Sequence, residues 1–311
     1  MELKYERYPY SDILGWSISR YEVFDKCKRQ YFFQYYARYA EGVPSYKIKQ
    51  LKELTSTALE VGNVVHDVLE AFLRRLQKSS SDVDEKRFFE YAAALTADYF
   101  SRKSFLEVYY GTVAGIDVAR ALSMVELCLK NFINSPVYSW IFMKAITNRA
   151  NWMIEPEGYG ETRLAGLKAY CKMDFLFPVD GDIVILDWKT GKKDMYKHSS
   201  QLIGYAAAAS SNFGIPWKTI YPKIVYLSPQ FDEFELKLRN EEFEGLFKRT
   251  KAQTEEMYSY CADIEKNKPL AMERFPKTPS TSMCGWCNFQ ELCFPDRKRG
   301  ASAAAPVALD W

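Results

Sequence analysis

The feature that most constrains the fold of this chain is a pair of strand-like runs joined by a short turn. Residues 169–177 and 183–189 are dominated by apolar and aromatic side chains, and residues 178–182 between them read Pro-Val-Asp-Gly-Asp. A connection rich in Pro, Asp and Gly between two such runs predicts a tight turn. We therefore expect a β-hairpin just past the middle of the chain.

The second run of this hairpin ends abruptly in Asp187-Trp188-Lys189. Residues i and i+2 of a strand share a face, so Asp187 and Lys189 should project together while Trp188 faces the opposite side. Pairing across the turn should bring Asp174 close to Asp187. Two carboxylates on one face suit Mg²⁺ or Mn²⁺, and a neighbouring lysine can orient a water or stabilise charge on a phosphate. The alternative interpretation is a surface Asp–Lys ion pair, so the hairpin alone does not establish a metal site.

The rest of the chain alternates between helical and strand patterns. Apolar periodicity predicts the main helices at about residues 17–36, 57–76, 199–211 and 241–266. Residues 42–52 are predicted to form a basic, flexible connection, and two further strands are expected near residues 223–227 and 234–238. This order predicts the α/β fold class, with helices covering a sheet.

Composition and pattern changes predict how the chain is organised. Residues 83–149 are helical in character and lack hairpin signals, which indicates a large helical insertion. The part after Gly300 is rich in alanine and is expected to be a flexible tail. The predicted parts are residues 1–82 (N-terminal helical part of the core), 83–150 (helical insertion), 151–270 (catalytic α/β core), 271–299 (C-terminal cysteine-rich region) and 300–311 (tail).

Candidate site residues also lie outside the hairpin. His66 is one of only two histidines and lies on or beside the apolar face of the predicted helix 57–76. There a neutral imidazole could ligate a metal, although a satisfied core histidine is the alternative. The predicted helix after the hairpin carries Gln201 and Tyr205.

These residues, taken in order, resemble the RecB-like branch of the PD-(D/E)XK nucleases. The resemblance rests on His66 in a Gly-x-x-x-His-x-x-Leu-Glu context, on Asp174, on the run Ile-Leu-Asp187-Trp-Lys189-Thr-Gly, and on Gln201-x-x-x-Tyr205. It implies a restriction-endonuclease-like core, in which helices flank a central mixed sheet. One departure is Cys171-Lys172-Met173 before Asp174, where the family often has a glycine.

The resemblance also implies a role for each residue. The metal ligands would be His66, Asp174, Asp187 and the backbone carbonyl of Trp188. Lys189 would be the catalytic lysine, and Gln201 and Tyr205 would support the site or contact DNA.

Four of the seven cysteines form a second candidate site. Cys284, Cys287 and Cys293 are spaced C-x₂-C-x₅-C near the C-terminus, and Cys27 could complete a set of four thiolates. Four thiolates suit either a [4Fe–4S] cluster or Zn²⁺. One cysteine before the core and three after it resemble the iron–sulfur members of the RecB-like nucleases, which include the CRISPR adaptation nucleases and the AddB type. That layout implies a structural [4Fe–4S] cluster, while the other three cysteines are expected to be plain buried thiols.

The net charge and the absence of targeting segments limit which partners and which cellular compartment we expect for the protein. The net charge is +2, so any surface that binds nucleic acid must be a local basic patch. The N-terminus lacks an apolar signal-peptide core, and no run approaches the length of about 18 apolar residues that a membrane span needs. We therefore expect a cytoplasmic protein without a membrane partner, whose thiols stay reduced.

The leading hypothesis is a Mg²⁺- or Mn²⁺-dependent deoxyribonuclease. The resemblance implies an exonuclease that acts on single-stranded DNA or DNA ends, with protein partners in a repair, phage-defence or CRISPR complex. The alternative is a catalytically inactive DNA-binding or scaffold subunit, against which the retention of both carboxylates and the lysine argues. An iron–sulfur or zinc protein without a nucleic-acid role would leave the hairpin and His66 unexplained.

Overall fold

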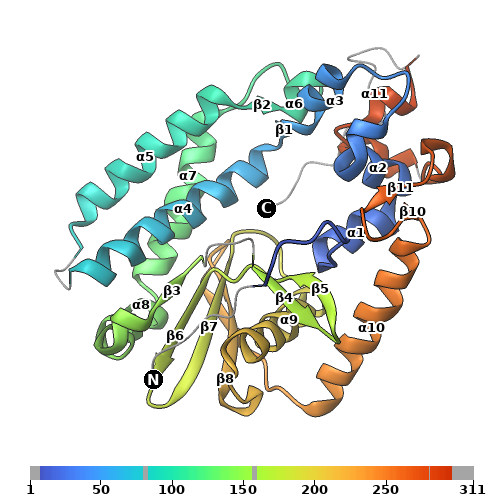
Figure 1. Ribbon diagram of the computed structural model, residues 1–311. Coiled ribbons are helices and arrows are strands. Elements are labelled where there is room, and N and C mark those ends of the chain that lie inside the picture. The colour runs from blue at the N-terminus through green and yellow to red at the C-terminus, as the bar shows by residue number, and fades with distance from the viewer. Residues whose placement is uncertain (1–7, 80–82, 156–159, 280, 296–311) are drawn as a thin grey trace.

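The computed structural model describes residues 8–79, 83–155, 160–279 and 281–295 (Figure 1). The predicted tail 300–311 and the last residues of the predicted cysteine-rich region lie outside these ranges. None of the helices in the described ranges is both long and apolar enough to cross a membrane.

A mixed five-stranded sheet forms the centre of the molecule, as predicted. Its strand order is β3-β6-β7-β8-β9. The central strand β7 pairs antiparallel with β6 and parallel with β8. The bounds of the five strands are β3 (Met153–Ile154), β6 (Phe175–Val179), β7 (Asp182–Lys189), β8 (Ile220–Tyr226) and β9 (Asp232–Glu235).

The expected hairpin is formed by β6 and β7. Only Asp180 and Gly181 lie between the strands, with φ angles of 50° and 94°. Asp-Gly tolerates the left-handed conformation at both positions, which gives the turn a twist that matches the strands. The register pairs Phe175 with Leu186 and Val179 with Asp182.

The first strand of the hairpin is shorter than predicted. The run 169–177 is divided between β5 (Leu167–Tyr170), which pairs with β4 (Glu161–Leu164), and β6. Between them the chain leaves the sheet, and the N–H of Cys171 donates to the carbonyl of Gly160 at 2.8 Å. Asp174 therefore lies just before β6 rather than inside a strand.

The two faces of the sheet are covered by different helices, and each has its own apolar core. Alternate residues of β7 divide between the cores, with Ile183 and Ile185 in one and Val184, Leu186 and Trp188 in the other. One core contains α1 (Ile18–Lys26), α2 (Lys28–Tyr36), α9 (Met195–Phe213) and α10 (Asn240–Tyr258). The other contains α4 (Thr57–Lys78), α5 (Glu85–Arg102), α7 (Val118–Ile133) and α8 (Pro136–Met143), and this predicted helical block therefore shares a core with the sheet.

Three further segments differ from the predicted secondary structure. The helix expected at 17–36 breaks at Cys27, whose backbone is extended (φ −159°, ψ 108°) and whose sulfur caps α2. The connection 42–52 contains α3 (Ser45–Lys52). The helix expected at 241–266 ends at Tyr258, because the chain turns into a small hairpin of β10 (Cys261–Asp263) and β11 (Lys268–Pro269).

Short elements complete the described chain. They are β1 (Leu54–Thr55), β2 (Ser104–Phe105), α6 (Leu106–Tyr109) and α11 (Gln290–Cys293), together with short 3-10 turns. Figure 1 shows the C-terminal segment with α11 near α2, and the rings of Phe33 and Phe289 pack at 5.4 Å between centroids.

Candidate active site

The end of β7 brings the predicted carboxylates together. Asp187 is 1% exposed, and it projects to the same side as Lys189. The backbone N–H of Trp188 donates to Oδ2 of Asp174 at 2.9 Å, which joins the loop before β6 to the end of β7. The indole of Trp188 faces the opposite side, where it packs edge-on against Phe132 at 5.4 Å between ring centroids.

The two oxygens of Asp187 contact different groups. Oδ1 accepts a hydrogen bond from the hydroxyl of Tyr205 at 2.9 Å, and that hydroxyl accepts one from Gln201 Nε2 at 2.5 Å. Both partners come from α9, four residues apart and therefore on one helix face. Oδ2 forms an ion pair with Lys189 Nζ at 2.5 Å, and no hydrogen bond from another described residue reaches it.

α4 carries His66 to the same place. Its Nε2 lies 3.1 Å from the carbonyl oxygen of Trp188, and its Nδ1 lies 3.4 Å from Oδ1 of Asp174. α4 approaches so closely because Gly62, one turn earlier, has no side chain. A Cβ at that position would lie 3.2 Å from Oγ1 of Thr190, directly after Lys189.

Burial and mutual charge shift the ionisation of these groups. Burial lowers the pKa of His66, but the charge of Asp174, the hydrogen bond to it and the charge of Asp187 raise that pKa to about 9. Burial and the charge of Asp174 raise the pKa of Asp187 to about 6, against the lowering effect of Lys189. Burial followed by the charge of Asp187 raises the pKa of Tyr205 well above its usual value, so its hydroxyl stays protonated and donates. The site thus concentrates negative charge that a bound cation would stabilise.

Sequence analysis missed one acidic residue of the site. Glu155 directly follows β3, and its backbone N–H donates to the carbonyl of Asp174 at 2.9 Å. A ligand atom from each of His66, Glu155 and Asp174 lies within 4.8 Å of the others, and among the described residues this is the group at the spacing of a single metal ion. Asp187 is outside that group because its oxygens face Tyr205 and Lys189. No spacing rule in the sequence points to Glu155.

The chemistry of these donors fits a hard divalent cation. Carboxylate and carbonyl oxygens are the ligands that Mg²⁺ and Mn²⁺ prefer, and an imidazole is compatible with Mn²⁺. Adjacent ligands of an octahedral Mg²⁺ site lie about 3 Å apart, close to the 3.1 Å between His66 Nε2 and the Trp188 carbonyl. The buried Oδ2 of Asp187, whose neighbour is the Lys189 ammonium at 2.5 Å, is a further oxygen that a cation could bind.

A comparison with protein families identifies the fold. The profile of the PD-(D/E)XK nuclease superfamily matches residues 15–294, which include every site residue described above. The chain belongs to the PD-(D/E)XK nuclease superfamily. A comparison with curated proteins gave no match. The α/β architecture around a central mixed sheet is consistent with the restriction-endonuclease-like fold, and superfamily membership indicates a metal-dependent nuclease.

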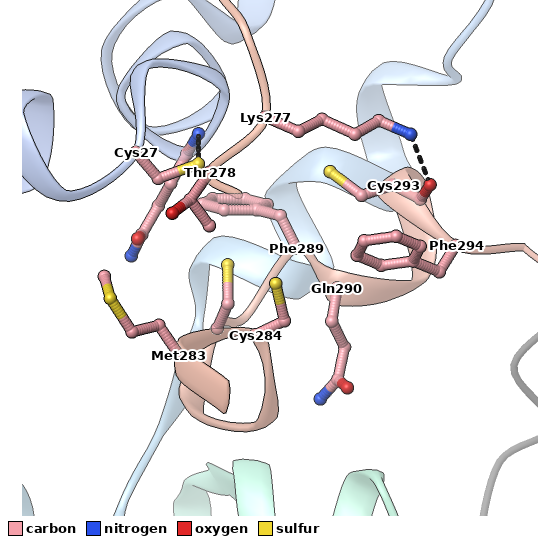
Figure 2. A pocket seen from close by; sticks show the side chains of 11 residues that line it. Cys27, Lys277, Thr278, Met283, Cys284, Phe289, Gln290, Cys293 and Phe294 are labelled. Carbon is pink, nitrogen blue, oxygen red and sulfur yellow. Dashed lines mark hydrogen bonds between the residues drawn. The ribbon is translucent and has the colours of Figure 1, made fainter. Parts of the chain in front are cut away.

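The four candidate cluster cysteines of this superfamily member line one pocket away from the sheet. Cys27 reaches it from the break between α1 and α2, and Cys284, Cys287 and Cys293 reach it from the C-terminal segment. Figure 2 shows the sulfur atoms of Cys27, Cys284 and Cys293 facing a common space. The segments are also tied directly, because the N–H and Nε of Arg29 donate to the carbonyls of Pro276 and Phe275 at 3.1 and 2.8 Å.

Without a bound cation, this pocket favours neutral thiols. Burial and the proximity of the other three cysteines raise the pKa of Cys287 to about 12, so thiolate ligands would form here only with a cation that compensates their charge. Burial also raises the pKa of Cys293, while Lys277 and Arg29 act to lower it. Of the remaining cysteines, Cys128 and Cys171 are buried as expected and Cys261 is only half-buried.

Proposed function

We propose that this protein is a metal-dependent DNA nuclease. The observation that carries the proposal is the pair of carboxylates, the half-buried Asp174 and the buried Asp187, with Lys189 Nζ 2.5 Å from the second of them. A surface ion pair would not need a second carboxylate, an imidazole and a buried tyrosine around it. Superfamily membership supports a nucleic-acid substrate and hydrolysis of a phosphodiester bond.

In this proposal Mg²⁺ or Mn²⁺ is held by His66, Asp174, Asp187 and the carbonyl of Trp188, and Glu155 is an additional ligand. The bound cation would supply Lewis acidity toward the phosphodiester. Lys189 orients a water or stabilises negative charge that develops on the phosphate. Tyr205, supported by Gln201, fixes the position of Asp187 through the hydrogen bond to Oδ1.

The proposed substrate is single-stranded DNA or a DNA end, and the proposed mode is exonucleolytic.

The four cysteines that line the pocket, Cys27, Cys284, Cys287 and Cys293, are proposed to hold a structural [4Fe–4S] cluster. The support for this proposal is the layout of one cysteine before the core and three after it, together with the fact that all four residues line one pocket. We also propose that residues 83–150 are an insertion into the nuclease core; its helices α5 and α7 pack on α4 and share an apolar core with the sheet.

A cleavage assay tests the nuclease. The full-length protein is incubated with end-labelled single-stranded DNA, duplex DNA and RNA in Mg²⁺, Mn²⁺ or EDTA. We expect cation-dependent degradation of DNA, and a loss of more than about a hundredfold in rate for Asp187→Asn and Lys189→Ala. The matched control is Asp180→Asn in the turn of the same hairpin, where the side chain is exposed and Asn tolerates a φ of 50°.

The outcomes separate the competing functions. If Asp187→Asn and Lys189→Ala both degrade DNA like the wild type, this site is not the nuclease centre. If the wild-type protein binds DNA but cuts it in neither cation, the DNA-binding scaffold is correct. Cleavage of RNA in preference to DNA would contradict the proposed substrate.

A further inference from the structure

The segment that follows the catalytic lysine is unusually exposed and carries both positive charge and an aromatic ring. Every side chain of residues 191–197 is exposed, and the segment reads Gly-Lys-Lys-Asp-Met-Tyr-Lys. Tyr196 is 80% exposed and Met195 is 44% exposed. The exposed ring of Tyr196 has three lysines, Lys192, Lys193 and Lys197, within four residues of it in the sequence.

Contacts to one residue place this segment beside the candidate active site. Tyr226 is the β8 partner of Lys189 in the parallel register. Its hydroxyl lies 3.6 Å from the sulfur of Met195, and Lys193 Nζ lies 5.3 Å from the centroid of its ring. His198, one turn into α9, contacts the same hydroxyl through Nδ1 at 2.7 Å. The segment is therefore fixed next to Lys189 rather than projecting at random.

The three lysines of residues 191–197 differ in what they contact. Lys193 pairs with Asp232 of β9, and Lys197 Nζ lies 2.8 Å from Glu22 of α1. Lys192 is exposed and has no ion-pair partner among the residues that the structure describes. Two of the charges thus hold the segment against β9 and α1, while the third is available to a phosphate.

We propose that residues 191–197 bind single-stranded DNA beside the bond to be cut, with Tyr196 stacking on a base and Lys192 contacting a phosphate. This rests on the proposed nuclease function and narrows its substrate class. An aromatic ring with adjacent lysines is the combination that binds single strands without reading their sequence. A base inside a duplex offers no free face to Tyr196, so the segment should distinguish single strands from duplexes.

Binding of labelled DNA to the full-length protein in EDTA tests the proposal without cleavage. Tyr196→Ala should weaken binding of a single strand about fivefold to a hundredfold, which is the range for the loss of one base–aromatic stack. Tyr196→Phe keeps the ring and should bind like the wild type. Lys192→Ala should lower the slope of log affinity against log salt by about 0.7, the contribution of one phosphate contact on a single strand. The matched control is Tyr91→Ala on α5, where the tyrosine is also exposed (47%) but lies away from the site.

A single strand whose bases are removed separates stacking from charge. On this abasic strand the wild type and Tyr196→Ala should bind equally. The proposal is overturned if Tyr196→Ala binds the normal strand like the wild type, or if it loses affinity equally for blunt duplex. Since binding is measured in EDTA, a wild type that binds single strands through Tyr196 but never cuts DNA would overturn the proposed nuclease and leave this inference standing.

Discussion

The Nε2 atom of His66 lies 3.1 Å from the carbonyl oxygen of Trp188, although 122 residues separate them in the sequence. The other ring nitrogen lies 3.4 Å from Oδ1 of Asp174. Both nitrogens thus face acceptors, which is the arrangement that a doubly protonated imidazolium satisfies. A cation that binds between the ring and the carbonyl must displace one of these protons.

Cation binding should therefore release a proton. The pKa of His66 is raised to about 9, so its ring is protonated at pH 7.5 and must become neutral to ligate Mg²⁺. Asp187, with a pKa raised to about 6, is already ionised there. We expect the release of about one proton per Mg²⁺ at pH 7.5. The affinity for Mg²⁺ should rise up to about tenfold per pH unit until the pH approaches the pKa of His66. Calorimetry in buffers of different ionisation enthalpy measures the released proton.

The matched variant is His66→Asn, which should bind Mg²⁺ more weakly and without coupled proton release. Below about pH 6 the wild type should release more than one proton, because Asp187 is then also protonated. Wild-type binding that is independent of pH between 6.5 and about 8.5 would show that His66 is not a ligand.

Tyr205→Phe tests whether the tyrosine positions Asp187. Its hydrogen bond favours the charged form of Asp187, so its removal should raise the pKa of that carboxyl further above about 6. We expect Mg²⁺ affinity to fall about 10–100-fold and the acidic limb of the activity profile to move to higher pH. Tyr221→Phe, on the exposed part of β8, should change neither. A Tyr205→Phe enzyme that is slower but has an unmoved acidic limb would mean that the tyrosine only supports folding.

The hairpin is predictable from sequence because its information is local. Apolar runs on either side of an Asp-Gly pair specify two strands and a two-residue turn. The register then follows, and with it the approach of Asp174 to the N–H of Trp188. The positions of Gln201 and Tyr205 on one face of α9 follow from helical spacing in the same way.

Features that depend on distant contacts are not predictable in this way. Glu155 reaches the site because β3, only two residues long, pairs with the edge of β6, and so short a strand has no detectable pattern. The break at Cys27 involves neither Gly nor Pro. There the N–H of Arg29 bonds to the carbonyl of Pro276 instead of to the preceding turn, so tertiary packing overrides a helical pattern.

Two glycine variants should separate helix stability from site geometry. Alanine in place of glycine stabilises a helix interior by about 0.8–1.0 kcal/mol. At Gly245 of α10 the added methyl meets Arg249 Nη1 at an ordinary 3.5 Å, so Gly245→Ala should raise the free energy of unfolding and leave activity unchanged. At Gly62 the methyl lies 3.2 Å from Thr190 Oγ1, so Gly62→Ala should push α4 away from the loop after Lys189 and lower activity.

Removal of the Thr190 side chain, which the added methyl at position 62 would contact, tests whether this contact causes the loss. The double variant Gly62→Ala/Thr190→Ala should recover most of the activity that Gly62→Ala loses. Urea unfolding and the cleavage rate are measured for all variants. If Gly62→Ala cuts DNA as fast as the wild type, the close approach of α4 to Thr190 has no role in the site.

The cysteine pocket should hold iron and sulfide rather than zinc. Protein purified without oxygen should contain about four iron and four sulfide per chain and show the visible absorbance of a [4Fe–4S] cluster. Cys287→Ala should lose that absorbance, and the variant Cys261→Ala, at a half-buried cysteine, should keep it.

The proposed cluster ligands come from the break between α1 and α2 and from the C-terminal segment, so ligand loss should lower the free energy of unfolding by about 3 kcal/mol or more. The proposed nuclease centre at the end of β7 shares no residue with the lining of this pocket, so the cleavage rate of Cys287→Ala well below its unfolding temperature should stay near that of the wild type. One zinc ion per chain would contradict the cluster, and a cleavage rate that disappears with the absorbance in folded protein would contradict its structural role.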